Sequence, residues 1–389
     1  MSFDVSYTSL SSYPPSTETL RSEFVEAVRC MELRPMMSKS ARKRAFEETS
    51  DWLAGHENLE EKNKRRHTFK QQLRDDLGAY RLGGDTAALT TLLQRLPRLT
   101  KITINADPPY QEESLTFESS ASEDLYTTAS IALPAIGWSG IELESLECGP
   151  QIYSAGHSGK PSMHANVLGL PLKTLTNFAS LRVLRLFLNA DEMTWGDNRH
   201  GLQCTSRFLQ HAPNLTDLHL CFSNFKHTTT IFEHIASSNT CPNLSSLSLE
   251  GFDMHEHSLV QFLSGRETRL QHILLANNMI RSGSWPTIFL QLSTFEHLTS
   301  FTVNQLSHEG KRVAFPNFGY ASVLWRPNND LPAGDWELVI GPEYIVELEG
   351  EIDRLDERLK ELAGCCKVQR IGVQPDLEDE SMLIWTYTP

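Results

Sequence analysis

A short apolar motif, Leu-x-x-Leu-x-Leu, recurs along the chain and constrains the fold more than any other feature of the sequence. Three copies match it fully, and the others carry Ile, Phe, Val or Cys at the later positions. The intervals between the first leucines are 44, 38, 34, 29, 26 and 28 residues, and the last three are close to the period of leucine-rich repeats. The seven copies begin at Leu99, Leu143, Leu181, Leu215, Leu244, Leu270 and Leu298.

Each motif predicts a short strand preceded by a helix. Alternate side chains of a strand point to the same face, so we expect the fourth and sixth motif residues to face the core. Before the first copy, Leu89, Leu92, Leu93 and Leu96 have helical spacing, and Asp85 is placed to cap that helix. One such unit cannot bury its apolar face alone, whereas stacked units can. We therefore predict an α/β fold, a leucine-rich-repeat-like solenoid with a curved parallel sheet and helices on the convex side. A doubly wound α/β domain is the alternative.

The irregular repeats are expected over residues 85–310, with a cap before them. Residues 1–84 do not match the repeat, and solenoids need atypical end units. This N-terminal cap is predicted to be mostly helical, over residues 41–77 in particular, with a first strand near residues 25–33 that includes Cys30.

A second cap is predicted over residues 311–389. It would contain a helix at residues 343–363 and a final strand at residues 382–387. The helix could dock on the last repeat as a lid or meet a partner helix. It is predicted from six apolar residues spaced three or four apart: Ile345, Leu348, Ile352, Leu355, Leu359 and Leu362.

The third and fifth residues of each motif are expected to face outward along the concave side of the sheet. The next outward position continues this pattern and adds Phe187, Cys221, Glu250 and Asn304. Among them, Val183, Phe187 and Leu274 are apolar and would be natural anchors for a protein partner, unless neighbouring loops cover them. The candidate partner-binding residues are Val183, Arg185, Phe187, Asp217, His219, Ser246, Ser248, Glu250, His272, Leu274 and Thr302.

The composition bears on the class of partner. The net charge of −14 disfavours binding to nucleic acid, whose phosphates repel an acidic surface. No apolar run reaches the roughly 20 residues that span a bilayer, so no membrane interaction is expected. The first residues lack the basic start and apolar run of a secretory signal. Together with an odd count of 7 cysteines, this predicts reduced thiols in a cytoplasmic or nuclear protein.

No motif predicts catalysis, a metal or a cofactor. The sequence lacks HExxH, GxGxxG, P-loop and GxSxG patterns. His255 and His257 flank Glu256, but residues two apart do not share a helix face, so they form a poor metal pair. We therefore expect no enzyme, no metal and no cofactor, and a surface that binds a protein not identified by the sequence.

The pattern of divergent repeats resembles fungal F-box and leucine-rich-repeat-like proteins. The resemblance rests on residues 25–30, on Leu96-Pro97-Arg98-Leu99, and on the Pro-Asn-Leu openings at Pro213 and Pro242. It implies repeats that hold a substrate and an F-box that binds the Skp adaptor of a cullin–RING ubiquitin ligase. No F-box is recognisable before Val25. The leading expectation is thus a non-catalytic interaction scaffold, and the alternative is a ubiquitin-ligase substrate receptor with a lost or truncated F-box.

Overall fold

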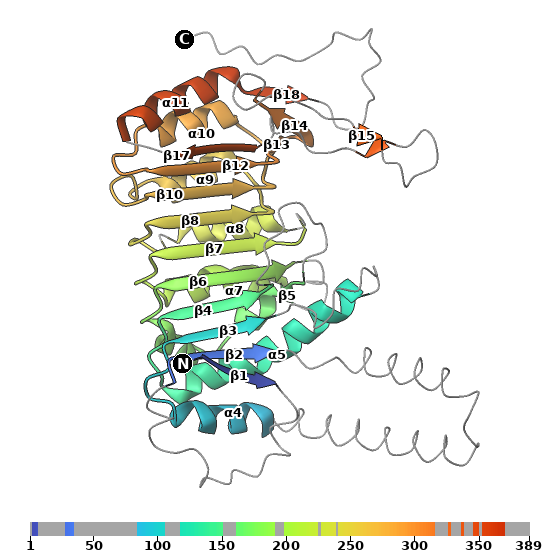
Figure 1. Ribbon diagram of the computed structural model, residues 1–389, viewed down its shortest axis with the longest axis vertical. Helices are drawn as coiled ribbons and strands as arrows, with labels where there is room; N and C mark the ends of the chain where they lie inside the picture. The colour runs from blue at the N-terminus through green and yellow to red at the C-terminus, as the bar shows by residue number, and fades with distance from the viewer. Residues whose placement is uncertain are drawn as a thin grey trace, which may run out of the picture. The chain divides into compact units, whose positions relative to one another are not determined.

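The computed structural model is an α/β protein with a mostly parallel sheet (Figure 1). The chain divides into two compact units, Met1–Asn189 and Ala190–Pro389, which we call the first and second units and treat separately. The structure describes residues 2–6, 28–34, 84–105, 117–150, 161–190, 198–224, 227–238, 240–315, 326–327, 336–337, 345–349 and 352–369.

The main strands of the first unit are parallel and follow one another across the sheet in chain order. A two-residue strand, β5 (Met163–His164), pairs beside the last of them. The main strands are β1 (Ser2–Ser6), β2 (Cys30–Arg34), β3 (Lys101–Asn105), β4 (Ser145–Gly149) and β6 (Val183–Asn189).

Helices connect these strands. The predicted helix before Leu99 is observed, but it begins at Gly84, so Asp85 lies inside the first turn and not at the cap. Gly137 lets the longest helix approach the next one, because a Cβ atom there would collide with Thr174. The helical segments are α4 (Gly84–Gln94), α5 (Phe117–Ser139), η2 (Ala165–Leu168), α6 (Leu172–Leu175) and η3 (Thr176–Phe178).

The motif residues form the core of this unit, as predicted. Ile102, Leu146 and Leu184, the fourth residues of three motifs, are in register on neighbouring strands and fully buried. The residues two positions later are buried in the same way. Alternation of buried and half-buried residues along β4 and β6 shows that the opposite face is partly open.

The structure adds one motif that sequence reasoning did not assign. Val28, Met31 and Leu33 are buried, and Met31 pairs in register with Ile102. They therefore occupy the first, fourth and sixth positions of a further copy, and β2 corresponds to the strand predicted near residues 25–33. Cys30, which was predicted to belong to this strand, takes the third position and is half-buried.

The main sheet of the second unit repeats the same plan. Its first four strands are parallel and in chain order, and a fifth pairs antiparallel to the last of them. They are β7 (Asp217–Phe222), β8 (Ser246–Glu250), β10 (His272–Ala276), β12 (Ser300–Asn304) and β17 (Ile345–Glu349).

A smaller sheet of short strands follows the main strands of this unit. Three of its strands come directly after β8, β10 and β12 in the chain, pair in parallel with one another, and are extended by two antiparallel strands. A separate pair, β15 (Arg326–Pro327) and β16 (Trp336–Glu337), is antiparallel. The smaller sheet consists of β9 (Asp253–Met254), β11 (Met279–Ile280), β13 (Ser307–His308), β14 (Lys311–Ala314) and β18 (Lys367–Gln369).

Successive helices of the second unit pack on one another, and α8, α9 and α10 lie on one side of the main sheet (Figure 1). That side is the core, where Leu218, Leu247, Ile273 and Phe301 are in register and at most 2% exposed. The helices are α7 (Asn198–Gln210), α8 (Thr228–Ser237), α9 (Glu256–Leu263), α10 (Trp285–Leu292) and α11 (Ile352–Cys365).

The predicted helix over residues 343–363 was wrong at its start. Ile345 and Leu348 lie in β17, and the helix begins only at Ile352. Residues 346–349 also alternate between apolar and acidic side chains, which suits a strand, and β12 offers an edge to pair with. Gly350 lies between the two elements and disfavours one continuous helix. The predicted strand at residues 382–387 and the predicted helix at residues 41–77 lie outside the described residues.

Asn278 is a structural residue that the sequence analysis passed over. Its side chain is fully buried, accepts a hydrogen bond from the backbone N–H of Phe252 (2.9 Å) and donates one to the carbonyl of Leu249 (2.9 Å). It thereby satisfies two backbone groups in the turn that links β8 to β9. The sequence does contain a signal for this role. Asn278 stands eight residues after Leu270, which is the position of the asparagine in the longer leucine-rich pattern Leu-x-x-Leu-x-Leu-x-x-Asn.

We expect Asn278→Ala to lower the free energy of unfolding by about 2 kcal/mol, because it leaves two buried backbone groups unpaired. Asn278→Asp keeps the acceptor and loses the donor, so it should also destabilise the protein. Urea unfolding followed by circular dichroism measures both changes. A wild-type midpoint for both variants would show that the turn does not depend on this side chain.

Candidate partner-binding face

The side of each main sheet that carries the third and fifth motif residues is called the outer face here. In the first unit, strand pairing aligns the fifth residues into one row across β2, β3, β4 and β6. A pocket of about 420 Å³ lies over this row. The row consists of Glu32, Thr103, Glu147 and Arg185, and all four residues line the pocket.

Two hydrogen bonds hold the carboxylates of this pocket. Lys101 Nζ donates to Glu147 Oε1 at 2.7 Å, and the two side chains are 40% and 20% exposed. Asn105 Nδ2 donates to Glu32 Oε1 at 3.0 Å. Glu147 is thus bonded to the ammonium group of Lys101, and Glu32 is bonded to the side-chain amide of Asn105. Since both acids are fixed by neighbouring strands, the pocket presents its charges in defined places.

Small residues open the pocket between these long side chains. Thr103 is 7% exposed and stands between Glu32 and Glu147 in the row, so it forms the floor. Cys30 lines the pocket and is half-buried. Cys148 on β4 also lines the pocket and is 1% exposed, and burial together with the charge of Glu147 raises the pKa of its thiol. At neutral pH that thiol stays protonated and is a poor nucleophile.

Phe187 is not the exposed anchor that the sequence predicted. It is 2% exposed, because its ring packs against Gly149, where any Cβ atom would collide with it. Gly149 has φ +147°, a conformation that L-residues rarely adopt, so a glycine is required there on two counts. Phe187 is nevertheless one of the residues that line the pocket. The other two predicted apolar anchors, Val183 and Leu274, are half-buried.

The outer face of the second unit holds the other eight predicted residues. Strand register aligns Asp217, Ser246, His272 and Ser300 in one row and His219, Ser248, Leu274 and Thr302 in the next. His272 is exposed, and the other residues of these rows are half-buried. Glu250 belongs to the third row and accepts a hydrogen bond from Asn277 at 3.4 Å. Cys221, also expected on this face, is buried at 3% exposure. The face is therefore mainly polar, with small hydroxyl side chains.

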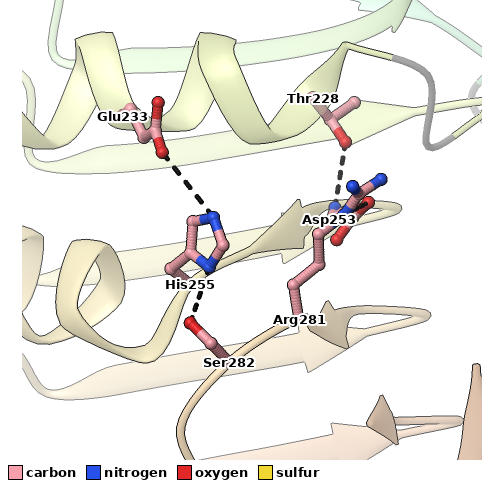
Figure 2. Close-up of polar contacts among 6 residues, drawn as sticks. All are labelled: Thr228, Glu233, Asp253, His255, Arg281 and Ser282. Carbon is pink, nitrogen blue, oxygen red and sulfur yellow. Dashed lines mark hydrogen bonds and ion pairs between the residues drawn. The ribbon is translucent and has the colours of Figure 1, made fainter. Parts of the chain in front are cut away.

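His255, the residue before α9, connects three successive repeats of the second unit. His255 Nδ1 lies 2.7 Å from Ser282 Oγ, and its Nε2 lies 3.8 Å from Glu233 Oε1 (Figure 2). Its ring stacks on that of His257. Although Ser, His and Glu are aligned, Ser282 is exposed to solvent, whereas a catalytic nucleophile needs a sheltered site. We interpret the contact as structural.

A buried carboxylate in the same view makes a second connection. Asp253 is fully buried, and Arg281 Nε donates to its Oδ2 at 2.5 Å. The backbone N–H of Asp253 donates to Thr228 Oγ1 at 2.9 Å (Figure 2). Because the three residues come from three successive repeats, the cluster ties these repeats together. In the part of the chain that the structure describes, no group of three or more His, Cys, Asp or Glu residues could hold a metal ion.

Comparison with known proteins found no matching family model and no matching curated protein. The resemblance to fungal F-box proteins stays a prediction, and so does the Skp adaptor as a partner. Among the described helices, none combines the length and apolarity needed to cross a bilayer. A cytoplasmic or nuclear location likewise stays a prediction.

Proposed function

We propose that the chain is a leucine-rich solenoid that acts as a non-catalytic protein-interaction scaffold, and that its partner binds to the outer face. The observation that carries the proposal is the difference between the two faces of the sheets. One face buries the first, fourth and sixth motif residues under helices, whereas the other carries mainly half-buried polar side chains and a pocket of about 420 Å³. Rows of side chains held rigidly by paired strands suit the binding of a protein surface.

The order of the strands supports this function over the enzyme alternative. A doubly wound domain binds its ligand where the order of parallel strands reverses. The described main strands of each unit follow chain order, so they contain no such reversal. The recurring helix and strand with Leu-x-x-Leu-x-Leu at equivalent positions also favours a repeat architecture.

Charge changes on the outer face are expected to remove partners while leaving folding intact. Arg185→Glu alters the first unit and Leu274→Asp the second, and both side chains are half-buried on that face. A desolvated wrong charge in an interface costs about 2 kcal/mol or more, which is roughly a thirtyfold loss of affinity. Affinity purification from the source cells, read by quantitative mass spectrometry, should show a shared set of depleted proteins.

The matched controls are Gln94→Glu on α4 and Gln261→Glu on α9, both exposed. They should keep the wild-type set of partners, and all four variants should melt within a few degrees of the wild type. Depletion by the controls alone, or unchanged profiles for both outer-face variants, would argue against the outer face as the binding surface.

A further inference from the structure

The floor of the pocket on the first unit contains a hydroxyl group that lacks a hydrogen-bond partner. Thr103 is 7% exposed, and no residue in the described part of the chain forms a hydrogen bond with its side chain. Its oxygen is not one of the described polar atoms that are sealed from solvent, so it opens into the pocket. A hydroxyl group that is largely removed from water without a partner costs free energy, and a ligand that bonded to it would recover that cost. The pocket therefore offers a defined polar contact on its floor.

The charged residues around Thr103 favour a neutral group as its partner. Lys101 Nζ lies 2.7 Å from Glu147 Oε1, and both residues line the pocket. Because Glu32 and Arg185 also line it, side chains of both signs surround the floor. An entering anion or cation would meet like charges as well as opposite ones, and removing a charge from water is costly unless it is fully paired. A neutral polar group is therefore the best partner for the hydroxyl of Thr103.

An aromatic ring of the protein lies within reach of this hydroxyl. Phe187 lines the pocket, and its ring packs against Gly149 on β4. Gly149 is the diagonal neighbour of Thr103, since Thr103 pairs with Glu147, two residues earlier on β4. Diagonal neighbours of this kind are roughly 7–8 Å apart, a distance that one aromatic side chain can span. Because rings attract one another edge to face or offset, a ligand ring beside Phe187 could also carry a polar group to Thr103.

Tyrosine is the side chain that combines these two properties. Its ring is apolar, and its hydroxyl lies at the tip, where it can donate a hydrogen bond to the hydroxyl of Thr103 or accept one from it. Phenylalanine has no polar group to offer, and the N–H of tryptophan lies on the side of its ring system and not at the tip. Tyrosine is also one of the residues that most often anchor protein interfaces in desolvated pockets. A pocket of about 420 Å³ has room for such a ring.

We infer that this pocket receives a tyrosine side chain of a partner protein, with the ring beside Phe187 and the hydroxyl bonded to Thr103. The inference rests on the proposed function, because it names the anchor of a partner at the same outer face. It goes further in specifying the anchoring side chain and the hydroxyl that selects it.

Selection of random peptides displayed on phage against the full-length protein tests the inference. Wild-type protein is expected to enrich tyrosine at one position of the peptide. The best peptide is then compared by fluorescence polarisation with a counterpart that has phenylalanine in place of this tyrosine. Wild-type protein should bind the tyrosine peptide about tenfold more tightly, which is the effect of one well-placed hydrogen bond. Thr103→Val keeps the shape of the side chain and removes the hydroxyl, so it should bind both peptides alike.

The matched control is Thr302→Val on β12, because Thr302 is also a fifth motif residue and is half-buried on the outer face of the second unit. This control should keep the preference for tyrosine, and both variants should melt like the wild type. Enrichment of peptides without tyrosine, or an unchanged preference for tyrosine in Thr103→Val, would overturn the inference.

Cys30 provides a readout that needs no variant, because it lines the pocket and is half-buried. The tyrosine peptide should slow the alkylation of Cys30 by iodoacetamide, as followed by peptide mass mapping, while Cys365 on α11 reacts at an unchanged rate. p-Cresol, which is the side chain of tyrosine alone, should protect Cys30 only at far higher concentrations. Equal protection of both thiols, none at Cys30, or equal potency of p-cresol would contradict a partner's tyrosine in this pocket. The proposed function would survive that result if outer-face variants still lost cellular partners.

Discussion

The variant Leu275→Asp is expected to lose cooperative folding of the second unit. Leu275 is 1% exposed, and it pairs in register with Leu249 on β8 and Val303 on β12. The substitution removes a buried apolar side chain, which costs about 2 to 5 kcal/mol, and buries a carboxylate, which costs several kcal/mol more. This is comparable with the whole stability of a typical domain, roughly 5–15 kcal/mol.

The neighbouring residue supplies a control with the same chemical change. Leu274 belongs to the same strand but is half-buried on the outer face. Leu274→Asp should melt within a few degrees of the wild type by circular dichroism, whereas Leu275→Asp should show no cooperative transition or a much lower midpoint. Leu218→Asp and Leu247→Asp should behave like Leu275→Asp, since both are also buried. If the two neighbouring variants melt alike, the assignment of the two faces is wrong.

Replacing Arg266 is expected to cost about 3 to 5 kcal/mol, the second largest effect that we predict. The side chain is 2% exposed, and its guanidinium donates hydrogen bonds to the carbonyls of Thr240, Cys241 and Phe262. Its carbon atom Cζ also lies 4.2 Å from the centre of the Phe262 ring. Burial lowers the pKa of this guanidinium, but arginine still carries its charge at neutral pH. Arg266→Met would leave three carbonyls unpaired.

Arg269→Met is the matched comparison, because Arg269 is exposed and bonds to Pro242 and Asn243 at the surface. Its loss should cost less than about 1 kcal/mol. Arg266→Lys should fall between the two, since a lysine keeps the charge but cannot reach three carbonyls with a planar fork. Chemical denaturation gives the three free energies. Equal destabilisation by the two Met variants would show that burial of Arg266 adds nothing.

The core could be predicted from the sequence because it depends on a local rule. Motif residues such as Leu184 and Leu220 share a face of one strand, and this holds whatever the neighbouring repeats contain. The outer positions could be named for the same reason. Their exposure could not, because Phe187 is covered by Gly149 from the neighbouring strand, a contact between residues 38 positions apart.

The end of the main sheet in the second unit could not be predicted for a similar reason. The spacing of apolar residues from Ile345 to Leu362 fits a helix throughout, yet the unpaired edge of β12 stabilises Ile345–Glu349 as a strand. Tertiary pairing therefore overrides a local pattern. The pocket was likewise missed, because it depends on β2, which was not recognised as a further copy of the motif, and on the pairing of β2 with β3.

Photo-cross-linking in the source cells tests most directly whether the outer face binds a partner. A photoreactive phenylalanine derivative would be placed at Val183 or Leu274 on the outer face, and at Gln94 or Gln261 on the helices. We predict discrete cross-linked proteins from at least one of the outer-face positions and none from the helix positions. Cross-links confined to the helix positions would contradict the proposal that the outer face is the binding surface.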